Sequence, residues 1–311
     1  MRVCRLVCQK AKAGIGVRGA RSAFILPLTP FPAFAMPLAL EASEKTRKPP
    51  RPRGVRPAHF MIQLENVTFT YNGSEEKGNL KNINLSIRQG EVILLCGESG
   101  CGKTTLTRLI NGLIPWYYEG ELNGIVKVDG KEIREQPLHI LSRKIGSVFQ
   151  NPRSQFFNVD TTSEIAFSCE NQGLPEDEIR ERIHQTVSLF QIENLIDRNI
   201  FHLSGGEKQK IACASVSAGE PEIFVLDEPS SNLDVAAIED LKHIISCWKS
   251  AGKTVIIAEH RLYYLMELAD RIIYMQNGEI RREWTTADFF RTVPKGSRKF
   301  RAATRQSKTD L

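Results

Sequence analysis

One glycine-rich segment constrains the fold of this chain more than any other feature. Residues 97–104 read Gly-Glu-Ser-Gly-Cys-Gly-Lys-Thr and fit the pattern GxxxxGK followed by Ser or Thr. An apolar run at 92–96, typical of a buried strand, comes directly before it, and a helical pattern follows from Thr105. Glycines here let backbone N–H groups curl around phosphate oxygens, and the start of a helix adds partial positive charge. Strand, loop and helix therefore predict a phosphate-binding loop rather than a plain turn.

The residues of this loop have distinct predicted roles. Lys103 is expected to reach the β- and γ-phosphates and to act in catalysis, and Thr104 is expected to offer its hydroxyl to Mg²⁺. Cys96 and Cys101 are expected to be small packing residues rather than catalytic thiols. The predicted nucleotide-binding residues of the segment are Gly97, Glu98, Ser99, Gly100, Cys101, Gly102, Lys103, Thr104 and Thr105.

A second apolar run, at 223–226, ends in two acids, Asp227 and Glu228. In a parallel sheet the carboxyl ends of the strands are where ligands bind. Asp227 suits a ligand of Mg²⁺, directly or through water, and Glu228 suits a general base that polarises an attacking water. Such a strand end on its own is more often merely solvated, but together with the phosphate-binding loop it predicts a hydrolytic site.

From Met61 onward the chain alternates short β-branched runs with helical patterns, which is typical of an α/β domain with a largely parallel sheet. Strands are predicted at 62–68, 82–87, 91–96, 125–128, 145–149, 223–227, 254–258 and 271–275. Helices are predicted at about 103–112, 138–142, 177–191, 206–219, 235–250 and 262–268. Between about 151 and 215 helical patterns prevail, which predicts a helical insertion.

Positive charge is concentrated at the two ends of the chain. Residues 1–60 hold 12 Lys and Arg against 2 acids and residues 291–311 hold 7 against 1, which leaves residues 61–290 with a net charge of −10. The overall charge therefore gives no reason to expect nucleic acid as a partner. We expect residues 61–290 to form the domain and residues 291–311 to be a basic tail.

Residues 1–60 are expected to be either a disordered extension or an artefact of the start site, with Met61 the favoured beginning. An organellar transit peptide is an alternative, because the segment is rich in Arg and poor in acids. A secretory signal is a less favoured one, because export would place a nucleotide-hydrolysing domain where ATP is scarce. The seven scattered cysteines form no CxxC pair and no zinc-like spacing, which favours a reduced, cytosolic chain. No apolar run reaches the ~18 residues of a membrane-spanning helix, so any membrane role would need partner subunits.

A further glycine-containing segment, at 203–210, reads Leu-Ser-Gly-Gly-Glu-Lys-Gln-Lys, and its Ser204 lies 107 residues after Gly97. This segment resembles the signature motif of the ABC ATPases. The resemblance covers Gln63 to about Arg282 and includes the aromatic loop, phosphate loop, glutamine loop, signature, acidic strand, D-loop and switch histidine in the family order. It implies the ABC form of the P-loop NTPase fold, with a mostly parallel sheet, an antiparallel β subdomain and the helical insertion. It also implies ATP and Mg²⁺ as cofactors.

The signature implies a second half-site for ATP. Ser204, Gly205 and Gly206 stand at a predicted helix start and would bind the γ-phosphate. Glu207 stands where the family more commonly has Gln. One domain cannot close both half-sites on the same nucleotide, so the resemblance implies a second ATPase subunit, identical or paralogous, in a head-to-tail dimer.

Two strand ends carry further matches. Gln150, after the strand pattern at 145–149, resembles the glutamine loop that contacts Mg²⁺ or water. His260, after the run at 254–258, resembles the switch histidine that contacts the γ-phosphate. A lone Gln or His at such a place is ordinarily a surface residue, so the catalytic interpretation depends on the order of the motifs.

Two more positions match less specific features of the family. Ser231 and Asp234 resemble the D-loop, which crosses the dimer interface, although Asp234 or Asn232 can also be a simple helix cap. Tyr71 resembles the aromatic residue that stacks on adenine. Its ring can equally belong to the core, and Phe69 is a nearby competitor.

The stretches at 149–157 and 258–262 resemble those of energy-coupling factor importers, the cobalt, nickel and vitamin uptake systems of bacteria. That resemblance implies a transmembrane coupling protein, gripped near 150–175, and a substrate-binding membrane subunit as partners. It also implies a peripheral location on the cytoplasmic face of a bacterial cell membrane.

The rival hypothesis is a soluble ABC ATPase that acts on the ribosome or DNA. Such proteins carry either a long coiled coil between the phosphate loop and the signature or two ATPase sets in one chain. This sequence has neither sustained heptads nor a second set of motifs. Transport is therefore the favoured hypothesis.

Overall fold

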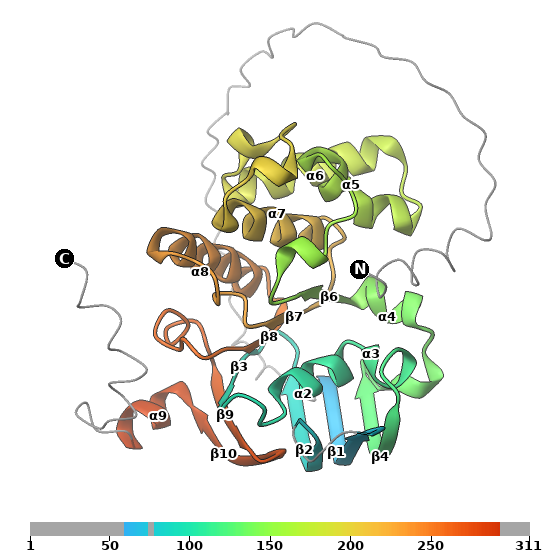
Figure 1. The fold of residues 1–311 in the computed structure, drawn as a ribbon, viewed down its shortest axis with the longest axis vertical. Coiled ribbons are helices and arrows are strands. Elements are labelled where there is room, and N and C mark those ends of the chain that lie inside the picture. The colour runs from blue at the N-terminus through green and yellow to red at the C-terminus, as the bar shows by residue number, and fades with distance from the viewer. Residues whose placement is uncertain (1–58, 74–77, 293–311) are drawn as a thin grey trace, which may run out of the picture.

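The computed structural model describes residues 59–73 and 78–292 and contains two sheets with helices around them (Figure 1). The predictions for residues 1–58 and 293–311 lie outside the described part of the chain. The strands are β1 (Phe60–Tyr71), β2 (Leu80–Arg88), β3 (Val92–Gly97), β4 (Gly120–Val128), β5 (Lys131–Glu132), β6 (Ile145–Val148), β7 (Ile223–Asp227), β8 (Thr254–Ala258), β9 (Arg271–Gln276) and β10 (Glu279–Thr285). The helices are α2 (Lys103–Ile110), α3 (Leu113–Trp116), α4 (Leu138–Lys144), α5 (Thr161–Gln172), α6 (Glu176–Phe190), α7 (Gly205–Ser217), α8 (Val235–Ser250) and α9 (Thr286–Thr292).

The larger sheet has six strands in the order β10-β9-β3-β8-β7-β6. All neighbouring pairs are parallel except β10 with β9, which is antiparallel. Strands β3, β7 and β8 are almost wholly apolar because both faces of the sheet are covered. Leu94 packs into one buried cluster, with α7 and α8, while Ile93 and Leu95 pack into the other, with α2 and the smaller sheet. The mostly parallel sheet predicted from the sequence is confirmed.

The smaller sheet has four strands in the order β2-β1-β4-β5, and all of its pairs are antiparallel. Helix α2 lies over it and buries Leu106, Leu109 and Ile110 among strand residues such as Ile62. The antiparallel β subdomain implied by the family resemblance is therefore present.

Helices α5, α6 and α7 gather on one side of the larger sheet, away from the smaller sheet (Figure 1). Helix α5 packs on α6 and α7, and α7 also packs on α8 and β6. Between residues 151 and 204 the described chain forms α5, α6 and short 3-10 turns, with one isolated bridge between Asp160 and Asn199 and no longer strand. This agrees with the helical character predicted there. None of the helices within residues 59–73 and 78–292 is both long and apolar enough to cross a membrane.

The predicted helix at 262–268 is wrong, because this segment forms turns. Its apolar run is buried all the same: Tyr264 and Leu265 lie in the core, and the Tyr264 hydroxyl is hydrogen-bonded to Glu259. A short apolar run fits a buried turn as well as a buried helix. The structure also contains the edge strand β10, which the sequence did not predict.

Candidate functional site

The phosphate-binding loop connects β3 to α2, and its shape depends on glycine. Gly97 has a φ of 152°, and a Cβ atom there would collide with the backbone oxygen of Met275 and lie 2.7 Å from Cys101 Sγ. Gly102, which precedes α2, has a φ of 105°. Residues with a side chain rarely adopt such positive φ angles, so glycine is required at both ends of the loop. No side chain caps the α2 N-terminus, so its first N–H groups keep no side-chain acceptor.

Lys103 folds back over this loop. Its Nζ donates hydrogen bonds to the carbonyl oxygens of Gly97, at 2.9 Å, and Glu98, at 3.1 Å. The side chain is only 4% exposed, and among the described residues it forms no ion pair with an acid. The ammonium charge is therefore buried in the loop with neutral partners, which suits the binding of an anion.

Thr104 and Asp227 meet across the space between α2 and β7. The Thr104 hydroxyl donates to Asp227 Oδ1 at 3.1 Å. Burial raises the pKa of Asp227 above its ordinary value, and the neighbouring Glu228 adds to the rise, while the Thr104 hydrogen bond opposes it. A bound cation would relieve this unfavourable burial of charge. A hydroxyl next to a carboxylate is the donor set that Mg²⁺ uses beside a nucleotide, so these residues fit the predicted metal.

Three strand ends bring the predicted catalytic side chains together. Glu228 follows β7, and its carboxylate accepts a hydrogen bond from Gln150 Nε2 at 3.0 Å and lies 3.0 Å from His260 Nε2. Gln150 follows β6 and His260 follows β8, the two strands that flank β7. Glu228 itself has a φ of 46°, a left-handed conformation that is uncommon for glutamate. Such strain is typical of functional sites.

Glu259, which the sequence did not single out, stabilises the segments that carry Glu228 and His260. The side chain is 2% exposed. Its carboxylate accepts hydrogen bonds from the backbone N–H groups of Ser230, His260 and Arg261, at 3.3, 2.7 and 2.9 Å, and from the Tyr264 hydroxyl at 3.1 Å. Burial, with the charge of Glu259, raises the pKa of Tyr264 far above its ordinary value, which keeps that hydroxyl a donor. One carboxylate thus links the segment after β7 to the segment after β8.

Tyr71 lies at the end of β1, and its ring is half-buried, whereas Phe69 is fully buried. Of the two, Tyr71 is the more accessible, although its ring also packs against the core, and Phe69 belongs to the core. The Tyr71 hydroxyl contacts Thr105 Oγ1 at 3.2 Å and Arg108 Nη1 at 3.1 Å, so the ring is attached to α2.

The signature residues lie at the start of α7 and form a capping box. The Ser204 hydroxyl accepts from the Glu207 N–H at 3.3 Å, and the Glu207 carboxylate accepts from the Ser204 N–H at 2.7 Å. The hydrogen bond from the Ser204 backbone N–H to the carboxylate is the main cause that lowers the pKa of Glu207 below its ordinary value. Gly205 is open, since a Cβ there would meet only the Asn232 oxygen, at 3.7 Å.

Asp234 caps α8 by accepting from the Ala237 N–H at 2.8 Å, so the alternative role weighed for it as a helix cap is real. Within the described part of the chain, no hydrogen bond or ion pair joins residues 204–207, Ser231 or Asp234 to the phosphate-binding loop. The structure thus brings Lys103, Thr104 and the acids of β7 together but leaves the signature apart.

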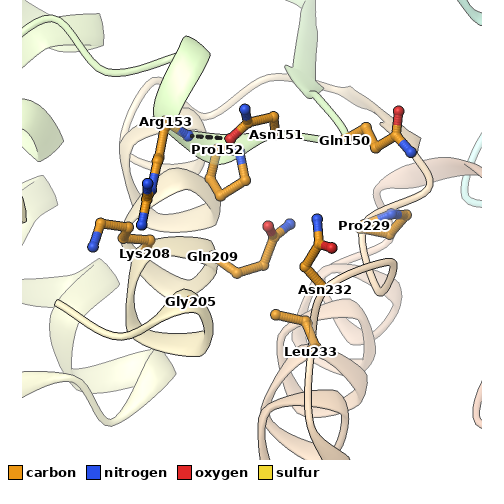
Figure 2. Close-up of a pocket in the computed structure, with 10 residues that line it drawn as sticks. All are labelled: Gln150, Asn151, Pro152, Arg153, Gly205, Lys208, Gln209, Pro229, Asn232 and Leu233. Atoms are coloured by element: carbon orange, nitrogen blue, oxygen red, sulfur yellow. Dashed lines mark hydrogen bonds between the residues drawn. The ribbon is translucent and has the colours of Figure 1, made fainter.

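A cavity of about 350 Å³ lies beside this second group, between the segment after β6, the start of α7 and the segment after β7 (Figure 2). Gln209 and Asn232 point into it, while Gln150 points away toward Glu228. Gln209 is 3% exposed, and its Nε2 has no hydrogen-bond partner among the residues described. The lining residues are Gln150, Asn151, Pro152, Arg153, Gly205, Lys208, Gln209, Pro229, Asn232 and Leu233.

Comparison with known proteins decides the family. The profile of the ABC transporter family matches residues 80–231. An ABC transporter ATP-binding protein of Pyrococcus horikoshii is 42% identical over 234 residues, which cover 75% of this chain and 82% of that protein. The chain belongs to the ABC transporter ATP-binding family. The members of this family are ATPases, and the geometry described above is that of an ABC ATPase core.

Solved structures agree with this assignment. The structure of cbiO1 from Clostridium perfringens, part of the ABC transporter complex cbiONQ, superposes with a TM-score of 0.67 at 30% identity and covers 75% of this chain and 91% of cbiO1. A dimeric post-hydrolysis state of the ATP-binding cassette MJ0796, bound to ADP and Pi, gives a TM-score of 0.63 at 28% identity, covering 73% of this chain and 99% of that one. The P-loop NTPase fold of the ABC ATPases is thereby established.

Other relatives are longer than this chain. An ABC transporter ATP-binding protein of Treponema denticola is 55% identical over 229 residues, which are 74% of this chain but 47% of that protein. A second protein of the same organism is 46% identical over 224 residues, again less than half of its length. The chain thus spans about half the length of these two curated relatives.

Proposed function

We propose that this chain is the ATP-hydrolysing subunit of an ABC-type importer of the energy-coupling factor class, which drives uptake of a metal ion or vitamin through partner membrane subunits. The observation that carries the proposal is the contact of Glu228 with both Gln150 and His260 at the end of β7, next to the phosphate-binding loop. A general base oriented by two neighbours is what ATP hydrolysis needs.

The residues of the loop would bind the triphosphate. Backbone N–H groups of residues 97–105 and the Lys103 ammonium would contact the phosphates, and Tyr71 would stack on the adenine. Thr104 and Asp227 would hold Mg²⁺, with Gln150 as a third contact. When bound, Mg²⁺ neutralises the charge of the phosphate groups.

Glu228 would then accept a proton from the attacking water. Its carboxylate is ready to do so because Gln150 holds one oxygen and His260 lies beside the other, so the side chain keeps one orientation. Glu259 fixes the backbone N–H of His260 and thereby the imidazole that would contact the γ-phosphate. Ordered groups of this kind lower the cost of orientation in the transition state.

A second ATPase subunit would complete the site. Ser204, Gly205 and Gly206 lie at the start of α7, apart from the chain's own phosphate-binding loop, and Gly205 is open to an approaching group. In a head-to-tail dimer they would cover the γ-phosphate held by the partner, together with Glu207, Ser231 and Asp234. The likeness to MJ0796, whose structure is dimeric with ADP and Pi bound, supports a dimer.

The energy-coupling factor class is supported by the likeness to cbiO1, which belongs to a transporter complex. Partners would be a transmembrane coupling protein and a substrate-binding membrane subunit, and the chain would sit on the cytoplasmic face of the cell membrane. A surface for the coupling protein is proposed near residues 150–175, where Phe157 is partly exposed and stacks on Phe167 with ring centres 4.5 Å apart.

Replacing the base tests the proposal. Glu228→Gln should lower the rate of ATP hydrolysis by ~10²–10⁴-fold, because the amide cannot accept the proton, while ATP still binds. Phosphate release and nucleotide binding measure the two effects. Glu239→Gln, a matched change on the exposed side of α8, should leave both unaltered. Full hydrolysis by Glu228→Gln would remove Glu228 from the mechanism.

The same variant tests the assembly, since it should be held in the ATP-bound state. Tagged and recovered from its own cells, it should bring membrane subunits with it. Recovery with ribosomes or DNA would contradict transport and support the rival hypothesis.

A further inference from the structure

The ring of Tyr71 is attached to the helix that begins in the phosphate-binding loop. The Tyr71 hydroxyl donates to Thr105 Oγ1 at 3.2 Å and accepts from Arg108 Nη1 at 3.1 Å. Thr105 and Arg108 are three residues apart on α2, so both project from one face of this helix. The Thr105 hydroxyl in turn donates to the Gly78 oxygen at 2.5 Å.

Arg108 is itself held in place by a second aromatic residue. Its guanidinium carbon lies 4.2 Å from the centre of the Tyr118 ring, a cation–π contact. Tyr118 also meets Tyr71 edge-on, with ring centres 6.2 Å apart and an angle of 87° between the rings. Within the described part of the chain Arg108 forms no ion pair, and its hydrogen-bond and ring partners are the two tyrosines, while its charge partly opposes the rise in the pKa of Asp227.

We propose that Arg108 and Tyr118 are positioning residues for the nucleotide base, because they hold Tyr71 at a fixed place relative to the phosphate-binding loop. The inference rests on the proposed ATP site, in which Tyr71 stacks on adenine. Tyr71 and the phosphate-binding loop would then bind the base and the triphosphate as parts of one rigid unit. Because the Tyr71 ring is already ordered, ATP binding would cost less conformational entropy. The hydroxyl explains why tyrosine serves here better than phenylalanine.

Comparison of two ligands tests the proposal on the full chain. Titration calorimetry with Mg²⁺ and either ATP or inorganic tripolyphosphate separates the base from the phosphates. Arg108→Ala should weaken ATP binding about 5-fold, the effect of one lost hydrogen bond, and leave tripolyphosphate binding within about 2-fold. In hydrolysis, KM for ATP should rise by a similar factor while kcat stays near its original value.

Arg143→Ala is the matched control, because Arg143 is an exposed arginine on α4 away from Tyr71. It should change neither ligand. Tyr71→Phe should weaken ATP binding at least as much as Arg108→Ala, because it removes the bond to Thr105 as well as the bond to Arg108. The two changes together should have less effect than the sum of each alone, because both break the contact between Tyr71 and Arg108. Arg108→Lys, which keeps a donor and a charge, should recover part of the affinity and also serves if the alanine variant fails to fold.

Equal weakening of ATP and tripolyphosphate would overturn the inference, since it would mean that Arg108 supports α2 as a whole. Additive effects of Tyr71→Phe and Arg108→Ala would overturn it as well. Unaltered ATP binding by Arg108→Ala would remove this inference alone and leave the proposed function standing. If the original chain binds neither ligand, the proposed function itself fails.

Discussion

The two helix starts that the sequence marks as phosphate sites, α2 and α7, differ in how far this chain completes them. At α2 no side chain caps the helix, Lys103 covers the loop, and Thr104 reaches Asp227 on the neighbouring strand. At α7 a capping box occupies the backbone N–H groups of Ser204 and Glu207, and the N–H groups of Gly205 and Gly206 lie between them outside the box. The first site is assembled from elements of one fold. The second is a capped helix N-terminus with an open glycine, Gly205, which suits contact with a group on another subunit.

Replacing one glycine in each site should give the largest difference in the free energy of unfolding between the two helix starts. Gly97→Ala should lower the free energy of unfolding by about 2–4 kcal/mol, because its Cβ collides with the Met275 backbone and its φ is left-handed. Gly205→Ala should change it by less than ~0.5 kcal/mol, since the nearest atom lies 3.7 Å from the added Cβ. Denaturant unfolding measures both. Equal losses would mean that the signature is as enclosed as the phosphate-binding loop.

Glu259 gives a test of intermediate size on the assembled side. Glu259→Gln keeps the shape but turns an amide N–H₂ toward backbone donors, so we expect a loss of about 1–3 kcal/mol in stability. Because His260 would shift, ATP hydrolysis should fall about 10-fold while ATP binding stays within about 2-fold.

Tyr264→Phe is the control for Glu259, because it removes one of the four donors and leaves the backbone contacts intact. It should cost ~1 kcal/mol and affect hydrolysis less. If Glu259→Gln hydrolyses ATP at the original rate, Glu259 does not position His260 for the proposed catalysis.

A smaller effect than at Gly97 or Glu259 is expected when the capping box of α7 is removed. Glu207→Ala should cost about 1 kcal/mol, the usual loss for a missing helix cap. Since the folded state lowers the pKa of Glu207, this contribution is present above the ordinary value of 4.5 and is lost as the pH falls through the lowered value.

Glu207→Gln can still accept from the Ser204 N–H but has no charge to titrate. Its stability should therefore depend less on pH in the acid range than that of the original chain. Thermal unfolding between pH 7 and pH 3 measures this. An unchanged acid dependence would assign the titration to other carboxylates.

Much of the fold follows from the sequence where a strand is buried on both faces. Strands β3, β7 and β8 were predicted within one residue, because a short apolar run between turn signals, rich in β-branched residues, is typical of a buried strand. Edge strand β10 was missed, because it carries Arg281, Arg282 and Glu283 on a largely exposed surface. The sequence at 262–268 predicts a helix where the structure has turns for the opposite reason, since burial alone makes its residues apolar.

The meeting of the proposed catalytic side chains could be predicted because they follow neighbouring strands of one sheet. Asp227, Glu228 and His260 end parallel strands of one sheet, and such ends meet at one edge. Glu259 obeys no such rule: its partners are three backbone N–H groups and a tyrosine from a turn, which no sequence pattern announces. The attachment of Tyr71 to Arg108 likewise joins residues 37 positions apart through a single hydroxyl.

The bonds of Lys103 to the carbonyls of its own loop have a consequence for how fast a nucleotide is caught. The hydrogen bonds from the Lys103 ammonium to two carbonyl oxygens of the loop stabilise its curvature. A phosphate group that binds to the loop would replace these carbonyl oxygens as the partner of an ammonium that is already in position. The loop would not have to fold into its curved conformation first. Little conformational entropy is lost in such an encounter, so association should proceed near the rate set by diffusion and orientation.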